Sequence, residues 1–86
     1  MTSNNLVVER VQTGVRMEKR LVKVLKALAE YHDISLGDLL EGIVLHAFDG
    51  KCAFQEEESL GVIKGLKKVY GLDLDAAASH KLKERS

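Results

Sequence analysis

The chain has 86 residues, with 13 Lys/Arg against 13 Asp/Glu, and its formal net charge is zero. This balance argues against a protein that holds nucleic acid through an overall basic excess. Apolar residues make up 45% of the chain and aromatic residues only 5%, with no Trp or Pro, so the core is expected to consist of Leu, Val, Ile and Ala.

The first expected element is a β-strand over residues 6–17, LVVERVQTGVRM, where apolar and polar residues alternate. It is the one convincing strand pattern in the chain, and a lone strand leaves its backbone N–H and C=O groups unpaired. We therefore expect its partner strand to come from another chain. The apolar face carries Val11, Thr13, Val15 and Met17, and the polar face carries Arg10, Gln12, Gly14 and Arg16.

A helical period replaces the alternation from Glu18, and the first helix is expected to end near residues 32–33. Ser35, with Asp38 three residues later, is typical of an N-cap and a weak capping box for a second helix, and Gly50 is expected to end that helix. The predicted apolar faces are Leu21, Val24, Leu25, Leu28 and Ala29 in the first helix, and Leu36, Leu39, Leu40, Ile43, Val44 and Ala47 in the second.

A third helical pattern begins at residues 56–58, whose three acidic side chains favour a first helical turn. Gly71 is expected to end this helix, and a short last helix is expected to begin near Asp73 or Asp75. We expect the apolar side of the third helix to pack on the body of a dimer. That side comprises Leu60, Ile63, Leu66, Val69 and Tyr70.

One strand followed directly by two amphipathic helices resembles the ribbon-helix-helix family, the Arc and methionine repressor-like DNA-binding proteins. The resemblance rests on VRMEKRLVKVLKALAEYHDISLGDLLEGIV, where Val15 and Met17 look like the family's inward strand residues and Ser35 like its second-helix cap. It implies a mostly α dimer in which one N-terminal strand pairs across subunits above two core helices, with a C-terminal helical extension. The ribbon and core of that dimer would comprise Val11, Thr13, Val15, Met17, Leu21, Leu25, Leu28, Leu40 and Ile43.

Because the family inserts its ribbon into the DNA major groove, the resemblance implies base contacts from the outward strand residues Gln12, Gly14 and Arg16. Gln and Arg can bond adenine and guanine edges bidentately, whereas Gly14 has no side chain and departs from the pattern. The family also holds phosphate at the start of the second helix, where Asp38 would compete with it. The implied phosphate contacts are Arg10, Lys19, Ser35, Leu36 and Gly37, although exposed cations such as Arg10 and Lys19 also serve solubility alone.

Other chemistries find little support in the sequence. The three histidines and Cys52 lack the close spacing of a zinc site, and no recognisable His/Asn signature accompanies Cys52 as a nucleophile. We therefore expect no metal, no cofactor and no enzymatic activity. No apolar run approaches the ~20 residues that span a bilayer, and the start MTSNNLVVER does not have the form of a signal peptide, so a cytoplasmic location is expected.

The leading expectation is a homodimeric DNA-binding protein, a repressor-like regulator of transcription. Its parts would be an N-terminal arm at residues 1–9, the ribbon-helix-helix core at 10–50 and a helical extension at 51–86. The extension would wrap the dimer or receive a protein or ligand. The alternative is a dimeric protein-interaction module, or an antitoxin-like protein, that keeps this fold without binding DNA; neutral charge, Gly14 and Asp38 favour it.

Overall fold

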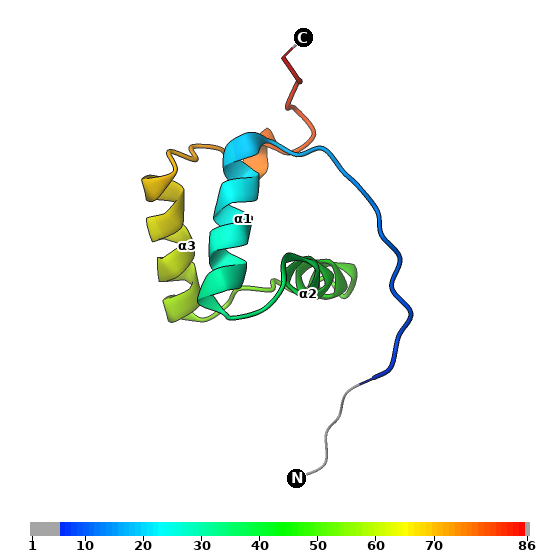
Figure 1. Cartoon of the computed structure of the whole chain (residues 1–86). Coiled ribbons are helices and arrows are strands. Elements are labelled where there is room, and N and C mark those ends of the chain that lie inside the picture. The colour runs from blue at the N-terminus through cyan, green and yellow to red at the C-terminus, as the bar shows by residue number, and fades with distance from the viewer. Residues whose placement is uncertain (1–5, 86) are drawn as a thin grey trace.

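Three α-helices form the body of the computed structural model, which describes residues 6–85. They are α1 (Lys19–Tyr31), α2 (Leu36–Phe48) and α3 (Glu57–Val69), followed by a single 3₁₀ turn, η1 (Ala76–Ala78). Figure 1 shows α3 antiparallel beside α1, with α2 on the other side of α1 and viewed almost end-on. The predicted mostly α class and the positions of the three helices are confirmed.

The starts of α1 and α2 are set by side-chain caps that satisfy backbone donors left free at a helix N-terminus. Oε1 of Glu18 accepts a hydrogen bond from the Leu21 N–H at 2.9 Å. Oγ of Ser35 accepts from the Asp38 N–H at 3.1 Å, which confirms the predicted N-cap. Between the two helices Asp33 takes a φ of 57°, a left-handed conformation that Asp tolerates better than most residues and that lets the chain turn.

Glycines follow α2 and α3 at the points where the chain leaves each helix. Gly50 has a φ of 69° and Gly71 a φ of 65°, conformations that cost glycine little because it has no Cβ. Both predicted helix ends are therefore confirmed. The expected last helix is reduced to η1, where Oδ1 of Asp75 accepts from the Ala77 N–H at 3.0 Å.

The core lies on the inner face of α1, which contacts both other helices. Leu28, only 2% exposed, packs with Ala29 and with Leu39 of α2. Because α3 contributes to the same cluster, the C-terminal extension packs on its own α1. Half-buried apolar side chains complete the cluster: Leu25, Ile43, Phe54, Val62, Ile63 and Leu66.

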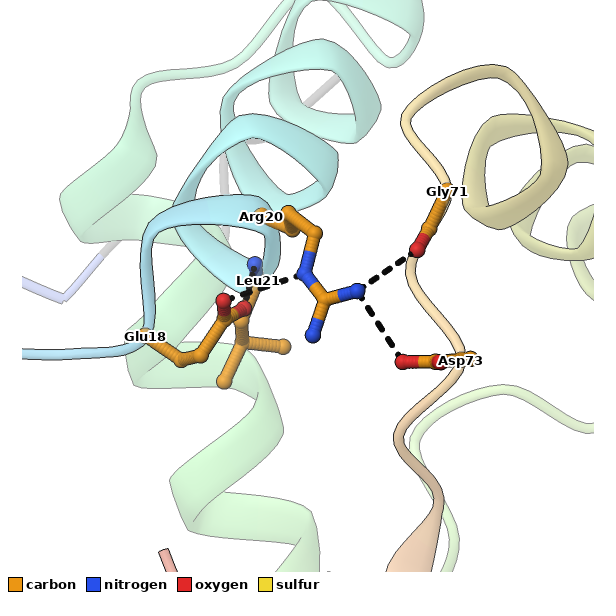
Figure 2. A network of polar contacts seen from close by, with 5 residues as sticks. All are labelled: Glu18, Arg20, Leu21, Gly71 and Asp73. Atoms are coloured by element: carbon orange, nitrogen blue, oxygen red, sulfur yellow. Dashed lines mark hydrogen bonds and ion pairs between the residues drawn. The ribbon is translucent and has the colours of Figure 1, made fainter. Parts of the chain in front are cut away.

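Polar contacts join the first turn of α1 to the segment after α3 (Figure 2). The Arg20 guanidinium donates from Nη1 to the Gly71 carbonyl at 2.8 Å and to Oδ1 of Asp73 at 3.0 Å. Its Nε donates to Oε2 of Glu18 at 3.1 Å. Next to this network, Leu72 is buried, so the chain after α3 is held against the start of α1.

The other ends of α1 and α3 are joined by a single hydrogen bond. The hydroxyl of Tyr31, the last residue of α1, donates to Oε2 of Glu58 in the first turn of α3 at 3.0 Å. This bond to a carboxylate raises the pKa of Tyr31 above its ordinary value. The two helices are thus tied at both ends as well as packed along their lengths.

The predicted ribbon-helix-helix arrangement is wrong. Residues 6–17 have extended backbone but form no strand, and no sheet occurs among residues 6–85. A strand needs a ladder of hydrogen bonds to a neighbour, and no backbone hydrogen bond joins residues 6–17 to the rest of the described chain. The expected ribbon face lies in solvent: Val11 is 82% exposed and Val15 72%, and Thr13 and Met17 are also exposed.

The other residues expected in the dimer core lie on the helices of the single chain. Leu28 is buried, while Leu21, Leu25, Leu40 and Ile43 are half-buried. Residues 1–5 of the expected N-terminal arm and Ser86 of the expected extension lie outside the described residues. Within the described range, none of the helices is both long and apolar enough to cross a membrane.

Candidate interaction surface

The extended segment before α1 passes α2 on its way from the N-terminal side of the chain (Figure 1). Between this segment and α2 lies an open groove with a volume of about 560 Å³. Its lining is mainly apolar, with a charged rim. The segment contributes Leu6, Val8, Glu9 and Arg10, and α2 contributes Leu40, Glu41, Val44 and Leu45.

Large apolar side chains around this groove lie in water. Leu6 is 87% exposed, and Val8, Val44 and Leu45 are also exposed. Phe48, in the last turn of α2, is 81% exposed. Full burial of one such side chain stabilises a protein by about 1.5–3 kcal/mol, and a contiguous apolar patch is a common mark of an interaction site. The groove with Phe48 is hereafter the α2 surface.

An ion pair forms the rim of the α2 surface. Arg10 donates to Glu41 with both arms of its guanidinium, from Nε to Oε2 at 2.9 Å and from Nη2 to Oε1 at 2.8 Å. These hydrogen bonds, and the positive charge, lower the pKa of Glu41 below its ordinary value. The side chains of Arg10 and Glu41 are 65% and 43% exposed, so the pair positions the extended segment beside α2 more than it stabilises the fold.

A second two-armed ion pair lies at the other end of the extended segment. Arg16 donates from Nε to Oε1 of Glu84 at 3.1 Å and from Nη2 to Oε2 of the same carboxylate. The Arg16 side chain is 84% exposed. The N-terminal segment is therefore held at two points, to α2 through Glu41 and to the C-terminal segment through Glu84.

The residues expected to contact DNA lie along the extended segment and at two helix starts. Gln12 and Gly14 are exposed, whereas the guanidinium groups of Arg10 and Arg16 each hold a carboxylate of the same chain. Arg10 is engaged by Glu41 of α2 and Arg16 by Glu84 of the C-terminal segment, so the two guanidinium groups are held at different places. Lys19 is exposed at the start of α1.

The expected phosphate site at the start of α2 is only partly open. Ser35 and Gly37 are exposed and Leu36 is half-buried. The Ser35 hydroxyl is already engaged as the cap of α2, and the exposed Asp38 carboxylate lies in the first turn. The structure therefore does not gather these residues with Arg10 and Arg16 into one compact site.

A row of cations runs along the outer side of α1. Lys19, Lys23 and Lys26 are spaced by four and three residues, which places them on one helix face, and all three are exposed. None of the ion pairs among the described residues involves them. No carboxylate that the structure describes offsets these three charges by direct contact. Arg10, Arg16 and Arg20, in contrast, each pair with a carboxylate.

Three residues were not among the sequence-predicted sites: Glu41 and Phe48 of the α2 surface, and Glu84, which pairs with Arg16. The sequence does single out Glu41, because it is the one acidic residue in the otherwise apolar middle of α2, LLEGIVL. It also singles out Phe48, as an aromatic residue in a chain with few aromatics. No feature of the sequence points to Glu84, since its pairing with Arg16 joins residues 68 positions apart.

Metal-binding and thiol chemistry are not supported by the geometry. No group of three or more His, Cys, Asp or Glu side chains able to hold a metal occurs in the part of the chain described here. Cys52 is free and exposed, and its Sγ contacts the Phe54 carbonyl at 3.3 Å. Nδ1 of His46 lies 2.7 Å from the Gly42 carbonyl within α2. The Cys52 thiol and the His46 imidazole therefore each make their contact within their own segment of the chain.

No family model, no curated protein and no solved structure matches this chain.

Proposed function

We propose that this chain is a homodimeric protein-interaction module that associates through apolar surface which the single chain leaves exposed. The observation that carries the proposal is the set of apolar side chains at α2 that the chain leaves in water: Leu6 is 87% exposed, Leu45 64% and Phe48 81%. Self-association is the usual way in which a chain this small covers such surface.

The composition of the exposed surface supports the same proposal. Five hydrophobic residues are buried in the described chain, while fifteen large hydrophobic residues are exposed. A core of this size stabilises a domain only marginally. Neutral net charge also favours association, because it removes the long-range repulsion that keeps strongly charged chains apart.

The proposal is tested by sedimentation velocity over a concentration series from nanomolar to high micromolar, with circular dichroism on the same samples. The expected result is a dimer that dissociates on dilution, with a loss of helical signal if the monomer is unstable. A chain that remains a folded monomer throughout the series contradicts the proposal.

Double-stranded DNA is the second candidate partner, favoured by the row formed by Lys19, Lys23 and Lys26. Lysines at this spacing can follow a phosphate backbone, and each phosphate contact releases counterions. Binding through such a row would be weak and independent of base sequence, because lysine contacts to phosphate carry no sequence information.

Fluorescence anisotropy with a labelled duplex, at low and at physiological salt, tests DNA binding. Lys19→Glu with Lys23→Glu is expected to abolish binding at low salt, whereas Lys64→Glu with Lys68→Glu on α3 makes the same charge change elsewhere and is expected to affect it less. Equal losses in both double variants would indicate a response to net charge alone. An absence of binding at low salt removes this candidate.

The proposed setting is the cytoplasm. A single exposed thiol, that of Cys52, remains reduced there, whereas an oxidising compartment promotes disulfides between chains. Fractionation of expressing cells tests this placement.

A further inference from the structure

The α2 surface contains a row of apolar side chains with a regular spacing. Leu40, Val44 and Phe48 follow one another at intervals of four residues, so they lie one above the other on the same face of α2. Leu40 is half-buried at one end of the row, and Phe48, at the other end, extends into solvent. The groove lies beside Leu40 and Val44, the first two side chains of the row, and the projecting Phe48 follows at the other end.

We propose that two copies of the chain pack α2 against α2 in antiparallel orientation about a two-fold axis at Val44, with Phe48 of each copy in the groove of the other. This inference rests on the proposed self-association and specifies its surface. In an antiparallel pair centred on residue 44, position 48 of one helix faces position 40 of the other. Each Phe48 therefore meets Leu40 of the second copy, beside the recess that residues 6–10 help to form.

A second copy fits this surface because the surface is complementary to itself. A two-fold interface brings the same patch together from both sides, so each contact is made twice. In each copy the row supplies one projection, Phe48, and one recess, beside Leu40 and Val44. A recess without a projection, or a projection without a recess, would instead require a different protein.

The charges at the rim also fit a second copy. Arg10 and Glu41 offset each other next to the apolar row, so two copies can approach without bringing like charges together unpaired. Both side chains are accessible to solvent, at 65% and 43% exposure, and can exchange partners between the copies. A rim of one sign would repel itself and favour a partner of the opposite charge.

Association through this surface covers apolar side chains that are otherwise in water. Leu6, Val8, Val44, Leu45 and Phe48 are between 42% and 87% exposed. The exposed apolar residues of α3 offer no comparable site. Leu60 and Val69 lie on opposite sides of that helix, and neither lines the groove beside α2.

Disulfide crosslinking tests the geometry directly. In a Cys52→Ser background, Val44→Cys is expected to give a covalent dimer on mild oxidation, because a residue at a two-fold axis meets its own copy. Leu40→Cys mixed with Phe48→Cys is expected to crosslink, whereas Leu40→Cys alone is not. Val69→Cys, an exposed apolar position on α3, is the matched control. Crosslinking at Val69 but not at Val44 overturns the proposal.

Sedimentation of the unlinked protein tests the role of Phe48. Phe48→Ala is expected to raise the dissociation constant of the dimer about tenfold or more, as loss of a central aromatic anchor does, while Val69→Ala leaves it unchanged. Circular dichroism confirms that both variants keep the helical content of the wild type.

Different results refute the α2 geometry and the self-association on which it rests. A wild-type dimer whose dissociation constant is unaffected by Phe48→Ala, and which does not crosslink through Val44→Cys, refutes the α2 geometry and leaves self-association standing. A wild-type chain that is monomeric at every concentration refutes both.

Discussion

Helices α1 and α2 have the same length, 13 residues, but they differ in how much of each is buried. Helix α1 has a charged outer row and buries Val24, Leu28 and Ala29. Helix α2 has the more apolar sequence, LGDLLEGIVLHAF, and buries only Leu39. The difference lies in their neighbours, because α1 packs against helices on two sides and α2 against one. Burial therefore follows the arrangement of the helices, which leaves apolar side chains of α2 such as Leu45 and Phe48 exposed.

The largest expected effect comes from truncating the covered helix. Leu28→Ala should lower the free energy of unfolding by about 2–5 kcal/mol, because the site is 2% exposed and the substitution leaves a cavity in close-packed surroundings. Val44→Ala on α2 is the matched comparison and should change monomer stability by about 0.5 kcal/mol or less. Urea denaturation at concentrations below the dimer transition measures both. Equal losses would mean that the two helices are equally buried.

A smaller effect is expected at the start of α2. Ser35→Ala removes the acceptor for the Asp38 N–H and should cost about 1 kcal/mol, a typical value for the loss of a helix cap. The exposed Ser79, which caps no helix start, serves as the control through Ser79→Ala. Thermal denaturation of the two variants gives the comparison. If Ser35→Ala melts with the wild type, the cap contributes nothing to the stability of this weakly covered helix.

The smallest expected effect is an acid dependence at the start of α1. The backbone hydrogen bond from Leu21 and the contact with Arg20 hold the pKa of Glu18 below its ordinary value of 4.5. A carboxyl with a lowered folded pKa stabilises the protein fully above its unfolded pKa, and this contribution is lost as the pH falls through the folded pKa.

Glu18→Gln should therefore reduce the loss of stability below pH 4.5, as measured by denaturant titrations at a series of acidic pH values. Glu41, whose pKa is also lowered, contributes with the same sign and remains in this variant. Glu30→Gln, an exposed change on the same helix, is the control. An unchanged acid profile in Glu18→Gln would show that the cap of α1 does not stabilise the folded state.

The sequence by itself determined where the helices lie and how they begin and end, because these features depend on local chemistry. The period of Leu21, Leu25 and Leu28, the cap at Ser35 and the left-handed glycines at 50 and 71 are all effects of residues a few positions apart. The alternation over residues 6–17 was just as regular, yet it forms no strand in the described chain, because a strand depends on hydrogen bonds from a neighbour that a local pattern does not supply.

Only the tertiary structure decided which apolar faces are covered and which charges are paired. Arg10 meets Glu41, and Arg16 meets Glu84, across 31 and 68 positions of sequence. The exposure of the α2 surface was also decided only by the tertiary structure, because its side chains are apolar like those of the core. Leu39 is buried because it packs with Leu28 and Ala29 of α1, whereas Phe48 lies outside that contact and is in water.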